Sequence, residues 1–258
     1  MRTLAAAVMI VVLALCGTAS VPTNATGSIA QTTMQNVFKD DFNGPAGSAP
    51  NPANWAFNTG ATGWGNHELE NYTTSRANSY LDGHGHLVIE AIRTAHGFTS
   101  ARLTSRFSAN NRTWEARIKF APQRGAWPAF WFLGSKIKSG VWPQCGEIDV
   151  AENYGSAYAN SSVHTASESG RMSNDVAPIP GSVSGWHIYR MVQSSGRVST
   201  YIDGRLIHTV TAHSQPWNFG PSNPVFMILN LAVGGTGGGK VPSSFKSVTM
   251  LIDYVHVW

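Results

Sequence analysis

The sequence predicts an all-β fold, an antiparallel β-sandwich formed by one domain from about residue 37 to residue 258. Apolar or alternating segments recur along the chain, and Gly, Pro, Asn or Ser interrupt them about every 8 to 12 residues, which is typical of sandwiches and barrels. No window has a long helical period, and no boundary of a second domain is visible. All-β domains of roughly 200 to 250 residues are common, so the length fits one domain.

The individual strands follow from alternation and from turn signals. A short apolar strand is predicted at residues 87–92, after a turn at 82–85. Residues 101–107 alternate, with Leu103 on the apolar side and Arg102 on the other, and residues 114–120 alternate more clearly. Further strands are predicted at 186–193, 198–202, 205–210, 226–233 and 249–258, with turns at 194–197 and 203–204 between the first three.

The first 36 residues are expected to lie outside the fold. Residues 1–19 have a positive start, an apolar run and small residues at the end, which indicates a signal peptide and a secreted protein. The polar composition of residues 20–36 predicts a flexible linker. Lipid anchoring through Cys16 is the alternative to secretion of the free protein. After cleavage no transmembrane segment is expected, and Cys145 would be a small buried hydrophobe without a disulfide partner.

Composition excludes several classes of partner. Charged residues make up 12% of the chain, about half of the roughly 25% usual for soluble domains. The net charge is +4, but the basic residues do not cluster as a nucleic-acid binder requires, so no nucleic acid is expected as a partner. Few charges and nine Trp instead favour a neutral, ring-shaped ligand. Zinc-ligand spacings and a phosphate-binding loop are both missing.

Three of the 14 acids lie within residues 147–152, in an apolar, strand-like context. Glu147 and Asp149 share a face of a strand, whereas Glu152 would lie on the opposite face unless a β-bulge at residues 150–151 restores the phase. Paired carboxylates of this kind perform retaining glycoside hydrolysis, with one as nucleophile and the other as acid/base. A solvated acidic strand or a Ca²⁺ site are the alternatives, although calcium favours oxygen-rich loops.

Residues 146–152 resemble the E-x-D-x-x-E signature of glycoside hydrolase family 16, in the bulged form typical of laminarinases, which are endo-β-1,3-glucanases. Other parts of the chain are similar to further segments of that family and follow in the same order. They are residues 40–44, 64–72 (WGNHELENY), 125–131, 142–145, 230–235 and 252–255.

The resemblance implies a concanavalin-like jelly roll with a concave substrate cleft, and catalysis without a cofactor. It assigns the nucleophile to Glu147, the acid/base to Glu152 and an assisting role to Asp149. The implied reaction is retaining endo-hydrolysis of β-1,3-glucan, so the expected partner is this polysaccharide. The protein itself is expected to be a monomer. Glu70 departs from the family, which often has Gln at this position, and so does His256, where Arg is common.

Further cleft residues are expected from residue type and from the resemblance together. Aromatic rings suit the apolar face of a sugar and amides suit its hydroxyls, whereas Trp114, Trp186 and Trp258 are expected in the core. For Glu68, a buried ion pair and a ligand contact both stay open. The resemblance also implies a structural Ca²⁺ at Asp253. The predicted substrate-binding residues are Trp64, Asn66, Trp127, Trp131, Trp142, His164 and Asn230.

Two groups of competing functions remain. Enzymes of the same family could act on mixed-linkage glucan or galactan, or as transglycosylases. A non-catalytic β-glucan-binding protein is the other alternative, and retention of Glu147, Asp149 and Glu152 favours the enzyme over it.

Overall fold

The computed structural model describes residues 35–120, 122–140, 142–167 and 171–258. The predicted signal peptide, Cys16 and the linker as far as residue 34 lie outside these residues. Within the described ranges, no helix is both long enough and apolar enough to cross a membrane.

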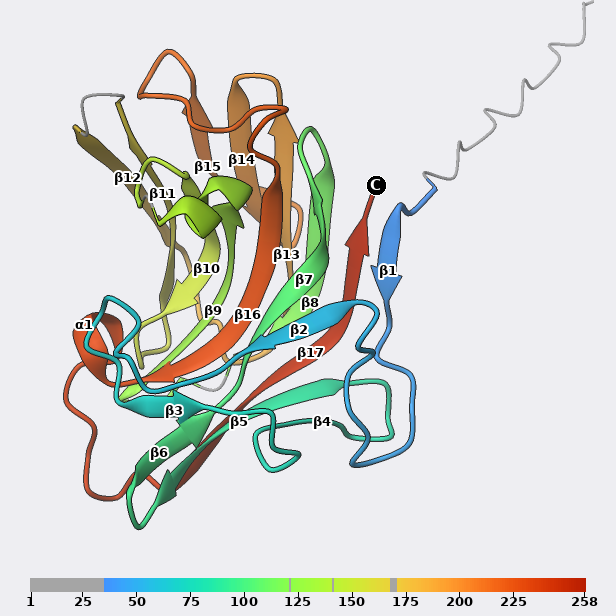
Figure 1. Ribbon diagram of the computed structural model, residues 1–258, viewed down its shortest axis with the longest axis vertical. Helices are drawn as coiled ribbons and strands as arrows, with labels where there is room; N and C mark the ends of the chain where they lie inside the picture. Colours follow the sequence, from blue (N-terminus) through green and yellow to red (C-terminus); the bar gives the residue numbers. More distant parts are fainter. Residues whose placement is uncertain (1–34, 121, 141, 168–170) are drawn as a thin grey trace, which may run out of the picture. The chain divides into compact units, whose positions relative to one another are not determined.

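The strands form two sheets that pack face to face (Figure 1). Every strand pair is antiparallel except β3 with β6, which confirms the predicted sandwich. The seven-stranded sheet has the order β12 (Met172–Ile179), β11 (Ala159–Ala166), β10 (Glu147–Asn153), β9 (Ala126–Gly134), β16 (Val225–Val233), β7 (Arg102–Ala109) and β2 (Trp55–Asn58).

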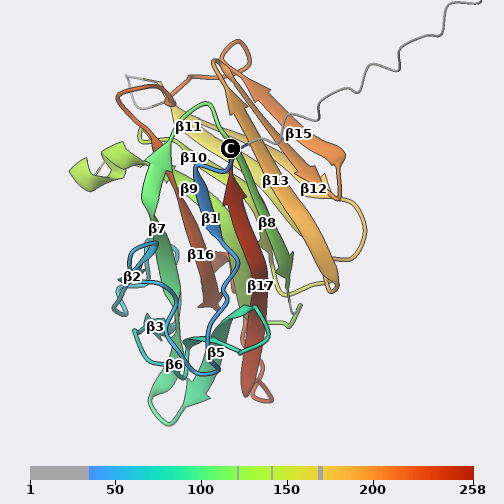
Figure 2. The same ribbon diagram turned by 90° about the vertical axis from the view of Figure 1, so that its right-hand side faces the viewer.

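The second sheet has ten strands and faces the viewer in Figure 2, where β1, β13 and β17 lie in front. Its main path is β15 (Arg205–Thr211), β14 (Arg197–Ile202), β13 (Trp186–Ser194), β8 (Thr113–Lys119), β17 (Ser247–Val257), β5 (Leu87–Thr94), β6 (Gly97–Ser100) and β3 (Glu70–Tyr72). Off this path, β1 (Phe38–Asp40) pairs with β17 and β4 (Ser79–Leu81) pairs with β5. Two short helical turns complete the fold, η1 (Ser135–Ser139) and α1 (Gly235–Gly238).

The core lies between the two sheets and follows the alternation of the strands. Trp114 of β8 is fully buried and meets Phe132 of β9 edge-on, with ring centroids 5.0 Å apart. Its predicted core position is therefore confirmed. Cys145 is also fully buried as a free thiol, and burial raises its pKa to about 11, which suits a packing role.

The predicted core positions of Trp186 and Trp258 are wrong, because both side chains are only half-buried. In β13 the buried positions are Tyr189, Met191 and Gln193, so strand alternation turns Trp186 outward. Trp186 stacks there on His86, with ring centroids 5.0 Å apart, on the outer surface of the ten-stranded sheet.

Candidate active site

A bulge in β10 brings the three acids to one face of the seven-stranded sheet. The register against β9 shifts between Asp149 and residue 151, as the sequence predicts. Asp149 lies opposite Trp131 and Glu152 lies opposite Ala129. Because Trp131 and Ala129 are two positions apart and share a face, Asp149 and Glu152 share that face although three positions separate them.

Two side chains of β11 join the three carboxylates into one cluster. The Ser162 hydroxyl donates to Asp149 Oδ2 at 2.7 Å and lies 3.3 Å from Glu152 Oε2. His164 Nε2 lies 3.1 Å from Asp149 Oδ2 and 3.8 Å from Glu147 Oε1. Asp149 is therefore the centre of the cluster, with Glu147 and Glu152 on either side of it.

The two glutamates have different hydrogen-bond donors. Trp142 donates its indole N–H to Glu147 Oε2 at 3.0 Å. Trp127 donates in the same way to Glu152 Oε1 at 3.0 Å, and the Tyr154 hydroxyl donates to Glu152 Oε2 at 2.8 Å. The imidazole of His164, when protonated, pairs with Glu147 and Asp149. The hydrogen-bond donors that contact Glu152 are all neutral.

Burial and the negative cluster shift the pKa values in this site. Burial and the charge of Asp149 raise the pKa of Glu152 to about 8. Burial alone would lower the pKa of His164, but Asp149 and Glu147 outweigh it and raise that pKa to about 9. Burial and Asp149 also raise the pKa of Glu147, whereas His164 and the Trp142 indole act against that rise. The pKa values of both glutamates are thus raised, and of the two Glu147 is the one that pairs with His164, which favours its charged form.

A chain of hydrogen bonds crosses the cleft beside the acids. Trp131 donates to Asn230 Oδ1 at 2.7 Å, and Asn230 Nδ2 donates to the Tyr72 hydroxyl at 2.9 Å. Tyr72 in turn donates to Glu68 Oε2 at 3.0 Å, and Asn66 Nδ2 lies 3.3 Å from Glu68 Oε1. Glu68 therefore holds Asn66 directly and Asn230 through Tyr72, and because Glu68 also lines the cavity a ligand contact stays a prediction.

The sequence analysis did not assign Arg102 to the cleft. Its guanidinium lies 4.8 Å from the Trp64 ring centroid and 4.7 Å from that of Trp131, so it packs on both rings. The signal was present in the alternation of residues 101–107, which put Arg102 opposite Leu103. Leu103 is fully buried in the core, and the opposite side of β7 is the side that faces the cleft.

The tryptophans differ in how much ring surface they offer. Trp142 is 48% exposed and presents a free platform at the rim. Trp127 lines the cleft, but its ring packs near Tyr154 at 6.0 Å between centroids, and a Cβ on Gly237 would lie 2.4 Å from it. Trp127 is therefore better described as a donor to Glu152 than as a stacking platform. The Gly-rich segment at residues 234–239 contains the turn α1 and packs against Trp127.

All predicted substrate-binding residues except His164 line one cavity together with the acids. Its volume is about 410 Å³. The described lining consists of Trp64, Gly65, Asn66, Glu68, Arg102, Trp127, Ala129, Trp131, Leu133, Ile137, Trp142, Glu147, Asp149, Glu152 and Asn230.

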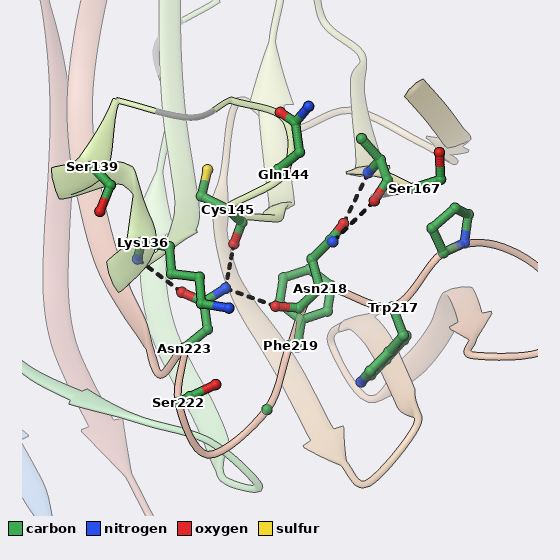
Figure 3. A pocket seen from close by; sticks show the side chains of 13 residues that line it. Lys136, Ser139, Gln144, Cys145, Ser167, Trp217, Asn218, Phe219, Ser222 and Asn223 are labelled. Carbon is green, nitrogen blue, oxygen red and sulfur yellow. Dashed lines mark hydrogen bonds between the residues drawn. The ribbon is translucent and has the colours of Figure 1, made fainter. Parts of the chain in front are cut away.

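A second cavity of about 580 Å³ lies between η1 and the loop at residues 216–223 (Figure 3). Its amides bind the surrounding backbone: Asn223 donates to the Cys145 carbonyl at 2.7 Å, and Asn218 pairs with both backbone groups of Ala166. None of its described lining residues is acidic. The three acids therefore belong to the smaller cavity.

Metal binding has little side-chain support at Asp253. Its Oδ2 pairs with Arg117 at 2.5 Å, so a cation would depend on Oδ1 and on backbone carbonyls. In the described part of the chain, one group of three metal-capable side chains lies within 4.8 Å, namely Glu147, Asp149 and His164. A protonated His164 opposes a cation there. The calcium ion at Asp253 stays a prediction.

Known proteins resemble this chain over most of its length. The family model for glycosyl hydrolases family 16 matches residues 65–256. A beta-glucanase from Rhodothermus marinus is 30% identical over 243 residues, which is 86% of this chain and 84% of the relative. A glucan endo-1,3-beta-glucosidase from Cryptopygus antarcticus is 30% identical over 250 residues, or 86% and 90% of the two chains.

Solved structures share the fold and, in one case, hold sugars. LamA from Zobellia galactanivorans, in complex with laminaritriose and laminaritetraose, has a TM-score of 0.78 and 28% identity, and the match covers 86% of this chain and 98% of that one. A more distant relative is named for another substrate. It is a keratan-sulfate endo-1,4-beta-galactosidase from Sphingobacterium multivorum, 25% identical over 246 residues, which cover 91% of this chain and 57% of the relative.

Proposed function

This chain belongs to the glycosyl hydrolases of family 16, and we propose that it is a retaining endo-glycosidase that hydrolyses β-1,3-glucan of the laminarin type. The observation that carries the proposal is the asymmetry of the two glutamates. Burial and Asp149 raise the pKa of both, but Glu147 also pairs with His164 and an indole N–H, whereas the donors to Glu152 are the neutral Trp127 and Tyr154. One ionised and one protonated carboxyl group side by side are what a retaining glycosidase requires.

The proposed reaction has two steps. Glu147 attacks the anomeric carbon and forms a glycosyl ester, while Glu152 gives its proton to the departing glycosidic oxygen. Glu152, now ionised, takes a proton from water, and the resulting hydroxide displaces Glu147 and releases the sugar with its original anomeric configuration. Asp149 and His164 regulate the charge on both glutamates through the contacts described above.

The cleft supports a neutral polysaccharide as substrate. Trp64, Trp131 and Trp142 line it with amides from Asn66 and Asn230, which suits sugar rings and hydroxyls. The names of the two curated relatives favour β-glucan, and that of the first solved structure favours laminarin oligosaccharides. We further propose a secreted monomer that needs no cofactor for catalysis.

Two alternatives are tested alongside. The mixed-linkage and galactan activities are favoured by the spread of names among relatives, such as the galactosidase above and an endo-1,3-1,4-beta-glycanase of Rhizobium meliloti at 28% identity. A non-catalytic glucan-binding role is disfavoured, because the three acids are retained and are joined by hydrogen bonds.

The experiment measures reducing ends released from laminarin, barley β-glucan, agarose and xyloglucan by the secreted protein. We expect the highest rate on laminarin, with Glu147→Gln and Glu152→Gln each slower by several orders of magnitude. Glu90→Gln, in a half-buried glutamate of β5, is the matched control and keeps the activity. Full activity of either cleft variant, or a higher rate on agarose or barley glucan, overturns the assignment.

A further inference from the structure

Tyr154 lies directly beside the proposed acid/base and none of the relatives' names or the sequence motifs gives it a role. It is the first residue after β10, two positions after Glu152, and its side chain turns toward Glu152. Its hydroxyl donates to Glu152 Oε2 at 2.8 Å, whereas Trp127 donates to Oε1 at 3.0 Å. The two rings lie 6.0 Å apart at 34°, so the two donors also pack against each other.

The backbone turn after β10 fixes the position of Tyr154. Asn153 is fully buried, its Oδ1 accepts from the Gly155 N–H at 3.2 Å, and its Nδ2 donates to the Tyr158 carbonyl at 2.8 Å. Gly155 has a φ of +67°, and a Cβ there would lie 2.9 Å from the Gln123 carbonyl oxygen. The turn therefore has little freedom, and Tyr154 reaches Glu152 from a rigid support.

We propose that Tyr154 is a positioning residue for Glu152: its hydroxyl and the Trp127 indole each hold one oxygen of the carboxyl group and stabilise the ionised form that remains after proton donation. This inference rests on the function proposed above. Ser162 contributes less to Glu152, because its single hydroxyl hydrogen is directed to Asp149 at 2.7 Å rather than to Glu152 at 3.3 Å.

The physical reason lies in the charge that develops during the reaction. Glu152 becomes negative as the glycosidic bond breaks, in a buried site next to Asp149, where an uncompensated charge is costly. Fixed donors aimed at that charge lower the barrier without reorganisation. Donation from Tyr154 also lowers the pKa of Glu152 against the effect of burial, so that the residue can act as acid and then as base.

The test titrates the Glu152 carboxyl carbon directly by ¹³C NMR in the full-length secreted protein, with its signal assigned from the Glu152→Gln variant. Tyr154→Phe keeps the ring and removes the hydroxyl. Tyr158→Phe is the matched control, since Tyr158 belongs to the same turn and is 65% exposed. The pH dependence of kcat/KM on laminarin is measured on the unaltered protein, on Tyr154→Phe and on Tyr158→Phe.

We expect Tyr154→Phe to raise the pKa of Glu152 by about 0.5 to 1 unit, because a hydrogen bond to the charged form is lost. The alkaline limb of the kcat/KM profile moves to higher pH by the same amount. The value of kcat falls about three- to tenfold, and KM changes little. An unchanged titration in Tyr154→Phe, or an equal shift in Tyr158→Phe, overturns the inference. If the unaltered protein cleaves no glucan, the proposed function fails, and the NMR titration alone still decides the role of Tyr154.

Discussion

Trp142 donates its indole N–H to Glu147 at 3.0 Å, although the Trp142 side chain lies at the cleft rim and is 48% exposed. The side chain that offers the most open ring surface to a sugar therefore also holds the proposed nucleophile. The roles proposed for substrate binding and for orienting the nucleophile therefore meet in one residue.

Trp142→Phe should separate these two roles, because it keeps an aromatic ring and removes the donor. The loss favours the protonated form of Glu147, so the acid limb of the kcat/KM profile moves to higher pH and the maximum falls about five- to thirtyfold. Trp217→Phe, in the second cavity, is the control with an unchanged profile. An acid limb that stays in place in Trp142→Phe would show that the hydrogen bond has no part in ionising Glu147.

His164→Gln should reduce stability in a pH-dependent manner. The pKa of His164 is raised to about 9 from 6.5, so its pairing with Asp149 stabilises the fold fully below pH 6.5 and is lost as the pH rises through about 9. The variant should be less stable than the original by about 1 to 3 kcal/mol at pH 6 and nearly equal to it at pH 10. Urea unfolding at both pH values measures this difference, and a gap that is constant with pH contradicts the charged state of His164.

Glu70→Gln should stabilise the protein at alkaline pH. Glu70 is fully buried, and burial together with Glu68 raises its pKa from 4.5 to about 8. The unfolded chain releases this proton at lower pH, so the original protein loses stability as the pH rises from 4.5 to about 8.

The Gln variant lacks that titration. Its free energy of unfolding should exceed that of the original by roughly 2 to 4 kcal/mol at pH 8.5, with little difference at pH 4.5. Glu90→Gln serves as the control. Equal stability of Glu70→Gln and the original at pH 8.5 would mean that Glu70 is ionised in the fold.

Gly237→Ala should impair catalysis from outside the acid cluster. The added Cβ would lie 2.4 Å from the Trp127 ring, so the ring must shift, and this disturbs its hydrogen bond to Glu152. We expect kcat/KM to fall at least tenfold and stability to fall by about 1 to 3 kcal/mol. Gly220→Ala is the matched control, because nothing lies within 4 Å of a Cβ there. Unchanged kinetics for Gly237→Ala would separate Trp127 from the function of Glu152.

Much of the fold could be predicted from local pattern alone. Each predicted strand from residues 87–92 to 249–258 is present with bounds shifted by a few residues, because alternation or a short apolar run between turn residues marks it. Strand β9 was not predicted, since it is apolar on both faces and contains Pro128, which argues against a central strand. Strand β12 was missed for the opposite reason: apart from Ile179 at its end, none of its residues is buried, and its apolar residues do not alternate with polar ones.

The site shows the same division. The bulge in β10 follows from the chemistry expected of Glu147, Asp149 and Glu152, and the structure contains it. Alternation put Arg102 on the polar side of β7, but neither Arg102 nor Tyr72 of β3 could be placed beside its partners, because strand order and register across a sheet are long-range properties. Tyr154 was within reach of sequence reasoning, since it lies two positions after Glu152.

The assignment of Glu147 as nucleophile and Glu152 as acid/base is tested most directly by trapping the intermediate. An activated 2-deoxy-2-fluoro β-laminaribioside slows the second step, so the glycosyl ester accumulates and peptide mass spectrometry locates it. We expect a single labelled peptide with the sugar on Glu147 and no label in Glu147→Gln. A sugar attached to Glu152, or turnover that inverts the anomeric configuration without any label, would contradict it.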